Sequence, residues 1–434
     1  MNNKLNQKFI KLSRRAFNTL LGASGLAAVG STQVFPDTKS NRAHILVIGG
    51  GFGGATAAKY LKIFEPSLSI TLIEPSRWYV SCPFSNTVIT GINKFSYIIN
   101  SFENLKNLNI KIIHEFVLDI NADNKEVTLS NQEKISFDLC IVSPGIDFRY
   151  ENIIGSSENI NKLIPHAWKA GVQTQLLRNQ LLAMPNGGTF LISPPPDPFR
   201  CPPGPAERIS LVAHYFKKYK PNSKIIVLDP KKKFGKQKLF KEGWEKLYPN
   251  MIEYRNVNEF GTVREISADK MMLITDVDEV KGNVINFIPA QKAGKIAFNS
   301  GLTDDSGWCP VNHQTFESKL QKGIYVIGDA SIVNPMPKSG VAAYSQAQAC
   351  AAAIIAKLRG KSPRTSKLIN YCYSLVAPDY GISVAMLYKF DGESIKKIEG
   401  AGGYSPTQKN TNFRKREALY AKSWYESMTK EIWG

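Results

Sequence analysis

The sequence predicts an α/β protein with two Rossmann-like domains and a C-terminal α+β domain. Three stretches carry this prediction: a strand and glycine-rich turn near residue 44, a strand, loop and helix near residue 189, and a strand and small-residue helix from residue 323. Alternation of short apolar strands with helices is typical of parallel sheets. With 434 residues, 43% of them apolar, the chain is long enough for two or three such domains.

The N-terminal unit has the residue pattern of a dinucleotide-binding site. In AHILVIGGGFGGATAAKYL, an apolar strand is followed by Gly49, Gly51 and Gly54 in GxGxxG spacing and by an alanine-rich helix. The first glycine permits a tight turn, the second lets the backbone approach a pyrophosphate, and the third allows close packing of helix on strand. Glu74 ends the next strand, SITLIEP, where a carboxylate can accept hydrogen bonds from an adenosine ribose. This unit alone fits either FAD or NAD.

A later strand and helix favour FAD at this site. The strand in GIYVIGDASIVNP ends in Gly328 and Asp329, and the small-residue helix KSGVAAYSQAQACAAAIIAKL follows. The pair resembles the second FAD motif of flavoproteins with two dinucleotide-binding domains, in which the aspartate holds the ribityl chain. Asp329 alone would be read as a helix cap. Residues 137–148, FDLCIVSPGIDF, resemble the segment that returns the chain to the central domain of such proteins.

The loop of the second strand–helix unit lacks the residues that bind phosphate. After the strand GGTFLIS, the sequence PPPDPFRCPPGP at 194–205 places Cys201 between prolines, where a glycine-rich loop for a pyridine nucleotide is expected. Prolines restrict φ and remove backbone donors, so the loop is rigid and poorly suited to phosphate. This predicts no NAD(P) site and favours thiol chemistry at Cys201, with a purely structural cysteine as the alternative.

The N-terminus resembles a twin-arginine export signal. Arg14 and Arg15 precede a stretch rich in glycine and alanine that is too short to span a bilayer. We therefore expect residues 1–41 to be a signal region and the protein to be periplasmic; an arginine pair in a simple tail is the alternative. The net charge is +19, and without the six Lys or Arg and one Asp of residues 1–41 it is +14. A basic surface favours acidic partners.

The six cysteines form no disulfide scaffold, CxxC or CxxCH motif, or metal-ligand pair with the five histidines. We therefore expect no metal and no covalent haem on this chain. Three cysteines lie in settings typical of packed thiols: Cys140, Cys309 and Cys350. Three lie in less apolar segments and are candidates for chemistry: Cys82, Cys201 and Cys372.

From about residue 42 to the C-terminus, the sequence resembles the flavoprotein subunit of flavocytochrome c sulfide dehydrogenase, a relative of the sulfide:quinone oxidoreductases. The segments that carry the resemblance are GGATAAKY, TLIEP, IPHAWKAG, DPFRCPPGP, QKAGKIA, GLTDDSGWCPV, NPMPKSG, CYSLVAPDYGISVA and SWY. The resemblance implies a glutathione-reductase-like fold and an FAD-dependent enzyme that oxidises sulfide or a related reduced sulfur compound.

The resemblance also assigns site residues. It implies covalent attachment of FAD to Cys82 through an 8α-thioether, a redox-active disulfide between Cys201 and Cys372 over the flavin, and a role for Glu207 in the chemistry. Pro83 and Phe84, which follow Cys82, depart from the family pattern.

On this reading, hydrosulfide attacks one sulfur of the disulfide and leaves a persulfide and a thiolate, and FAD then takes the electrons. Arg200 and Arg208 are candidates for lowering the pKa of the thiolate. Glu207 either shuttles the proton or is an exposed residue at a helix start.

The electron acceptor is expected outside this chain, because the sequence has no second GxGxxG and no CxxCH. The resemblance favours a c-type cytochrome subunit. One alternative is a sulfide:quinone oxidoreductase at the periplasmic membrane face. A second is a flavin-containing binding or sensor protein with a basic surface, although nucleic acid is not expected as a partner of an exported protein.

The C-terminal segment from about residue 410 is amphipathic, and its candidate apolar anchors are Leu419, Trp424, Met428 and Ile432. It is expected to pack on the protein body or on a partner, with peripheral membrane contact as the alternative. The predicted layout is a signal region at 1–41, an FAD domain in two parts at 42–160 and 286–362, a central domain without an NAD loop at 161–285, and a C-terminal domain at 363–434 that brings Cys372 over the flavin.

Overall fold

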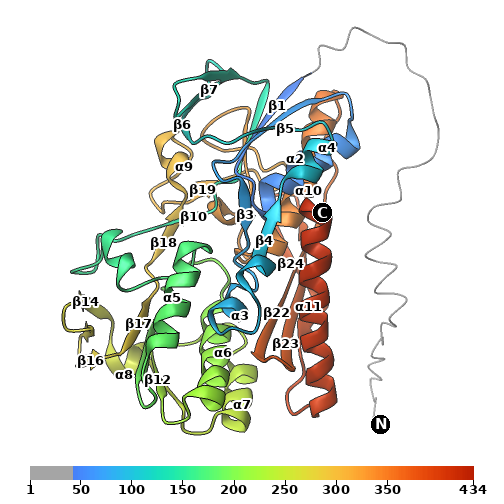
Figure 1. Cartoon of the computed structure of the whole chain (residues 1–434). Helices are drawn as coiled ribbons and strands as arrows, with labels where there is room; N and C mark the ends of the chain where they lie inside the picture. Colours follow the sequence, from blue (N-terminus) through green and yellow to red (C-terminus); the bar gives the residue numbers. More distant parts are fainter. Residues whose placement is uncertain (1–42) are drawn as a thin grey trace, which may run out of the picture. The chain divides into compact units, whose positions relative to one another are not determined.

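The computed structural model describes residues 43–434, and the predicted signal region at residues 1–41 lies outside the described residues. Two parallel sheets and a C-terminal antiparallel sheet organise the described chain (Figure 1). This is the α/β architecture that the sequence predicts. Among residues 43–434, no helix combines the length and the apolar character that crossing a membrane requires.

The first sheet contains the strand that leads into the glycine-rich motif near the N-terminus. Its strands are, in spatial order, β20 (Ile324–Val326), β9 (Leu139–Val142), β1 (His44–Ile48), β2 (Ser69–Ile73) and β5 (Lys111–Ile113). All neighbouring pairs in it are parallel. Because β20 lies far downstream of the other four strands, two separate segments of the chain build this sheet.

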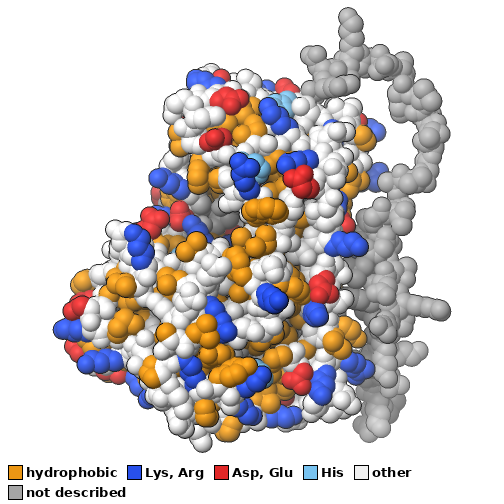
Figure 2. Space-filling view, viewed as in Figure 1, with side chains coloured by type: hydrophobic (Ala, Val, Ile, Leu, Met, Phe, Trp, Pro, Cys, Tyr) orange, Lys and Arg blue, Asp and Glu red, His pale blue; other side chains and the backbone are white. Residues whose placement is uncertain are grey.

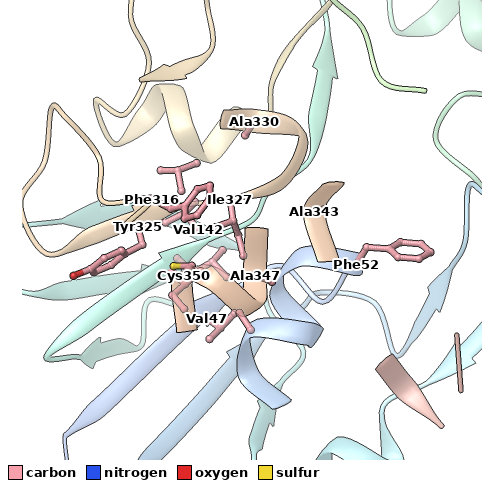
Figure 3. Packing of buried hydrophobic residues seen from close by; sticks show 14 of the residues in the cluster. Val47, Phe52, Val142, Phe316, Tyr325, Ile327, Ala330, Ala343, Ala347 and Cys350 are labelled. Atoms are coloured by element: carbon pink, nitrogen blue, oxygen red, sulfur yellow. The ribbon is translucent and has the colours of Figure 1, made fainter. Parts of the chain in front are cut away.

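Two helices rich in small residues, α2 (Phe52–Phe64) and α10 (Gly340–Leu358), pack against each other beside this sheet. Ser339 caps the N-terminus of α10, because its Oγ accepts a hydrogen bond from the amide of Ala342 at 3.1 Å. Figure 3 shows Ala343 and Ala347 of α10 close to the apolar side chains of the sheet. Small side chains on the helices allow this close approach and build one continuous core.

The second parallel sheet has the order β13 (Ile252–Asn256), β12 (Lys224–Asp229), β11 (Thr189–Ser193) and β17 (Val284–Phe287). The helices of this unit are α5 (Val172–Ala183), α6 (Gly204–Tyr219), α7 (Gln237–Leu247) and α8 (Val257–Phe260). A small antiparallel sheet is attached to it, formed by β14 (Val263–Ser267), β15 (Met272–Thr275) and β16 (Glu279–Lys281). The proline-rich loop thus joins β11 to α6, the position of a phosphate loop in a Rossmann-like unit.

The C-terminal sheet is an antiparallel meander of β22 (Lys367–Ala377), β23 (Tyr380–Phe390) and β24 (Ile395–Tyr404), and α11 (Thr411–Trp433) packs on it. Met428 and Ile432 of α11 are buried, whereas Leu419 is 65% exposed. The amphipathic C-terminal segment therefore packs on the protein body as expected, and Leu419 is the candidate anchor that lies on the outer face of the helix.

Shorter elements connect these units. The remaining helices are α3 (Ser85–Ile89), α4 (Glu103–Asn107), α9 (Lys295–Asn299) and three 3₁₀ turns at Phe95–Ile98, Asn159–Lys162 and Gly328–Ala330. The remaining strands are β3 (Trp78–Val80), β4 (Ile99–Ser101), β6 (Val117–Asn121), β7 (Glu126–Leu129), β8 (Lys134–Ser136), β10 (Ile146–Phe148), β18 (Gln291–Ala293), β19 (Cys309–Pro310) and β21 (Ser331–Ile332).

Candidate active site

A cleft of about 780 Å³ lies where the strands of the first sheet end and α2 and α10 begin. Its wall includes seven residues that the sequence analysis names: Gly49, Gly51, Glu74, Cys82, Arg200, Gly328 and Asp329. Ligands of open parallel sheets bind at the carboxyl ends of the strands, so the cleft lies where a dinucleotide is expected.

The glycine-rich turn has the geometry that a pyrophosphate requires. Gly49 has φ +96°, a conformation that favours glycine, and a Cβ on Gly54 would lie 1.8 Å from the carbonyl oxygen of Gly49. A Cβ on Gly51 would meet only the ring of Tyr79, at 3.4 Å, so this backbone is open to the cleft. The Glu74 carboxylate accepts a hydrogen bond from the amide of Gly50 at 2.8 Å, which holds it at the mouth of the turn.

Asp329 has a free acceptor that suits the ribityl chain of a flavin. Its Oδ2 lies 3.8 Å from the Arg200 guanidinium, whereas its Oδ1 is buried and has no hydrogen-bond partner among residues 43–434. Burial raises the pKa of this carboxyl. A buried unpaired oxygen is rare in folded proteins and is satisfied when a ligand donates to it. The wall of the cleft thus fits FAD: backbone for the pyrophosphate at one end, Glu74 for the ribose, and Asp329 for ribityl hydroxyls.

Cys82 lies in the wall of the same cleft, between β3 and α3. Its thiol donates a hydrogen bond to the carbonyl of Trp168 at 3.4 Å. Phe84, which departs from the family pattern, has φ +66° and stacks on Tyr425 of α11 with ring centroids 4.6 Å apart. The unusual residue therefore contacts the C-terminal helix and leaves the cysteine at the cleft.

The structure brings Cys201 and Cys372 together from different parts of the chain. Cys201 follows β11 in the proline-rich loop, has φ +58°, and is held by a hydrogen bond from its amide to the carbonyl of Lys338 at 2.9 Å. Cys372 is in β22, opposite Val384. Both are free thiols here, and each is close enough to shift the pKa of the other; the Cys372 thiol donates a hydrogen bond to the carbonyl of Tyr373 at 3.4 Å.

The two thiols differ in acidity. The neighbouring Cys201 thiol lowers the pKa of Cys372, and the nearby Lys236 ammonium and Ser374 hydroxyl lower it further, although burial and the Glu207 carboxylate act in the opposite direction. The neighbouring Cys372 sulfur and burial raise the pKa of Cys201. Cys372 is therefore the more acidic thiol of the pair.

Lys236 is a site residue that the sequence interpretation missed. Its side chain is buried, and its ammonium donates to the Ser374 hydroxyl at 2.7 Å and to the Cys372 carbonyl at 3.1 Å, and lies 4.0 Å from the Cys372 sulfur. The run 230–247 mixes lysines with aromatic residues at roughly helical spacing, a pattern typical of a solvated helix face with a buried apolar stripe. Lys236 lies four residues before Phe240, which is buried in that stripe, and this spacing was the available signal.

Arg200 and Arg208, the expected cations of the site, interact with Cys201 and Cys82, whereas Lys236 is the cation that contacts Cys372. Arg208 is buried and donates to the side chains of Asn86 and Asn286 and to the carbonyl of His166, and burial lowers its pKa to about 9.

Glu207 is not the exposed residue that one interpretation of the sequence suggested. It is partly buried in the first turn of α6 and accepts hydrogen bonds from the amide of Leu375 at 2.9 Å and from Asn86 at 2.8 Å. Burial raises the pKa of its carboxyl. Glu207 therefore joins α6 to β22 at Leu375, which lies three residues after Cys372 in the strand. Its carboxyl group can hold a proton next to the cysteine pair.

The C-terminus contributes a second feature that the sequence did not indicate. Trp433 is buried, stacks on Tyr79 with ring centroids 4.6 Å apart, and donates from Nε1 to the carbonyl of Gly50 at 3.2 Å. The end of α11 therefore supports the turn that faces the cleft.

A dinucleotide cleft built on one of two Rossmann-like units, with a cysteine loop in place of the second phosphate loop, defines a flavoprotein oxidoreductase of the pyridine nucleotide–disulfide type. Residues 43–182 match the family described as pyridine nucleotide-disulphide oxidoreductase. Residues 174–289 match the central part of the sulfide dehydrogenase [flavocytochrome c] flavoprotein chain, and residues 364–433 match the flavin-binding part of flavocytochrome c sulphide dehydrogenase. The chain belongs to this family of sulfide dehydrogenase flavoproteins, which is related to the sulfide:quinone oxidoreductases.

Individual relatives agree with this assignment. The sulfide dehydrogenase [flavocytochrome c] flavoprotein chain of Chlorobaculum thiosulfatiphilum is 59% identical over 44 residues, which cover 92% of that short sequence and 10% of this chain. Mouse mitochondrial sulfide:quinone oxidoreductase is 24% identical over 72% of this chain and 70% of its own length. The solved structure of the sulfide:quinone oxidoreductase from Aquifex aeolicus shares the fold, with a TM-score of 0.69, 19% identity and coverage of 89% of this chain and 92% of that one.

Proposed function

We propose that this protein is an exported, FAD-dependent sulfide dehydrogenase of the flavocytochrome c type, which passes electrons from sulfide through Cys201 and Cys372 to a c-type cytochrome. The observation that carries the proposal is that the fold brings Cys201 and Cys372 together, with the Lys236 ammonium 4.0 Å from the Cys372 sulfur, while Arg200, the neighbour of Cys201 in the chain, lies in the wall of the cleft that fits FAD. The periplasmic location is part of the proposal and rests on the twin-arginine pattern of residues 1–41.

The reaction begins with the cysteine pair as a disulfide. Hydrosulfide attacks one sulfur, the bond between Cys201 and Cys372 breaks, and its electron pair leaves on the other sulfur as a thiolate, so that one cysteine becomes a persulfide. Overall, sulfide loses two electrons and leaves at the oxidation level of elemental sulfur. Bound FAD supplies the two-electron acceptor. Glu207, with its raised pKa, accepts or returns the proton at its carboxylate.

We further propose a covalent thioether between Cys82 and the flavin, supported by the position of its sulfur in the cleft wall. After acid precipitation of the native protein, the yellow colour is expected to stay with the pellet. In Cys82→Ser it is expected to move to the supernatant, because serine cannot form the thioether. Cys350→Ala is the matched control, since Cys350 is buried in α10 and is not part of the cleft wall. Colour released from the native protein as readily as from Cys82→Ser would contradict covalent attachment.

The c-type cytochrome is proposed as acceptor because the matched families are those of a flavocytochrome c, and the net charge of the chain suits an acidic partner. After reduction by sulfide under argon, an acidic c-type cytochrome is expected to reoxidise the flavin at least about tenfold faster than a soluble quinone, and more slowly as salt is added, because salt screens the attraction. Stopped-flow absorbance measures both rates. A faster reaction with the quinone would instead favour the quinone-linked enzyme that the mouse and Aquifex relatives represent.

The alternative of a binding or sensor protein has less support. Lysine and arginine side chains are spread over the face shown in Figure 2 and do not gather in a single patch. Salt-dependent DNA binding without any bleaching of the flavin by sulfide would favour that alternative.

A further inference from the structure

Lys236 has the environment of a residue that acts through its charge. It precedes α7 with φ +62°, and its side chain is 6% exposed. Within residues 43–434, its ammonium has only neutral hydrogen-bond acceptors and the sulfur of Cys372 in contact, whereas Lys231, in the same loop, pairs with Asp229 at 2.7 Å. A buried ammonium without a contacting carboxylate is costly unless an anion forms beside it.

We propose that Lys236 is the positioning residue that makes Cys372 the leaving thiolate and so directs hydrosulfide to the sulfur of Cys201. This inference rests on the proposed function of the cysteine pair and adds a direction to it. The anion that Lys236 is placed to balance is the thiolate that forms when the disulfide opens.

The charges around the pair support this direction. Cys372 is approached by the Cys201 thiol from the loop before α6, by Glu207 from α6, by Lys236 from the loop before α7, and by the Ser374 hydroxyl from its own strand. Of these groups, only Lys236 carries a positive charge, and it lies 4.0 Å from the sulfur of Cys372. Arg200, next to Cys201 in the chain, has its guanidinium beside Asp329 and the carbonyl of Trp168.

Hydrosulfide forms a new sulfur–sulfur bond with Cys201, and the bond from Cys201 to Cys372 breaks. Its electron pair goes to Cys372, which becomes a thiolate beside the ammonium. The proton of hydrosulfide stays on the terminal sulfur of the Cys201 persulfide or passes to Glu207. Disulfide exchange is faster when the leaving thiol has the lower pKa, so attack at Cys201 is favoured.

The test uses the reduced holoenzyme and the pH dependence of alkylation by iodoacetamide, followed for each cysteine by mass spectrometry of its peptide. In the native protein we expect a midpoint near pH 6 for Cys372, because the neighbouring Cys201 thiol, the Lys236 ammonium and the Ser374 hydroxyl lower its pKa to about 6. In Lys236→Met the midpoint is expected to rise by about one to two units, and alkylation of Cys372 at pH 7 to fall about two- to tenfold.

Two matched variants separate charge from structure. Lys236→Arg keeps the charge and is expected to keep an acidic midpoint, whereas Lys233→Met removes an exposed lysine of the same loop and is expected to change nothing. Thermal unfolding checks that each variant is folded. After anaerobic addition of sulfide, the persulfide is expected on Cys201 in the native protein and on both cysteines in Lys236→Met.

An unchanged alkylation midpoint in folded Lys236→Met, or a persulfide found chiefly on Cys372 of the native protein, would overturn the role of Lys236. The proposed function survives that outcome as long as sulfide reduces the native flavin through the cysteine pair. Conversely, the function fails if sulfide reduces the flavin equally well without Cys201, even where the alkylation profile is as expected.

Discussion

Sulfide is expected to reduce the flavin of Cys201→Ser at least about a thousandfold more slowly than that of the native protein, because a serine can neither form the disulfide nor carry a persulfide. The rate that decreases should be that of the chemical reaction between sulfide and the cysteine pair. Dithionite should still reduce the variant, since Cys201 is not needed for the cleft that fits FAD. Anaerobic stopped-flow absorbance of the flavin measures both reactions.

Cys350→Ala is the control for this experiment. It also removes a thiol, but one that is buried in α10 with a pKa raised by its burial, so sulfide should reduce this variant at the native rate. Equal bleaching of Cys201→Ser and the native protein would remove the cysteine pair from the reaction and leave sulfide to react at the flavin directly.

The second large effect is expected at the glycine-rich turn. Gly51→Val should lower the flavin content per chain at least about tenfold, because the new side chain fills the space in which the backbone approaches the pyrophosphate. The fold should be retained, since the first atom of that side chain meets Tyr79 at 3.4 Å, an ordinary contact, and φ at Gly51 is −75°. Flavin absorbance relative to protein, with circular dichroism on the same sample, measures both.

Substitutions at two other glycines serve as comparisons for this prediction. Gly403→Val, at a position where an added Cβ meets nothing within 4 Å, should leave the flavin content unchanged. Gly54→Val should disturb the turn itself, because the added Cβ would lie 1.8 Å from the Gly49 carbonyl oxygen. A full complement of flavin in Gly51→Val would show that the cofactor does not cross this turn.

Local sequence patterns were sufficient for the framework of the molecule. The spacing of Gly49, Gly51 and Gly54 after an apolar strand has few structural solutions, and the structure shows the turn and helix that it predicts. These features depend on contacts within one strand–helix unit, which is why they can be predicted from a local pattern. Asp329 also lies in the cleft wall, but its position after a strand alone indicated only a helix cap, and the resemblance to a flavoprotein motif predicted its place.

The candidate site depends on contacts between units, and the sequence was informative there only through family resemblance. Nothing in the spacing of Cys201 and Cys372, 171 residues apart, indicates that β22 lies beside the loop before α6. The same holds for Lys236 and Trp433, whose roles come from partners far away in the chain. The position of Arg208 near Cys201 in the sequence likewise does not indicate that its guanidinium donates hydrogen bonds to Asn86 and Asn286.

The most direct test of the central claim is to add one equivalent of isotopically labelled sulfide to the oxidised protein under argon, quench within the first turnover, and examine both cysteine peptides by mass spectrometry. We predict that the labelled sulfur appears as a persulfide on the Cys201–Cys372 pair before or together with the bleaching of the flavin. Bleaching of the flavin with no labelled sulfur on either cysteine at any time in the first turnover would contradict the claim that electrons enter through this pair.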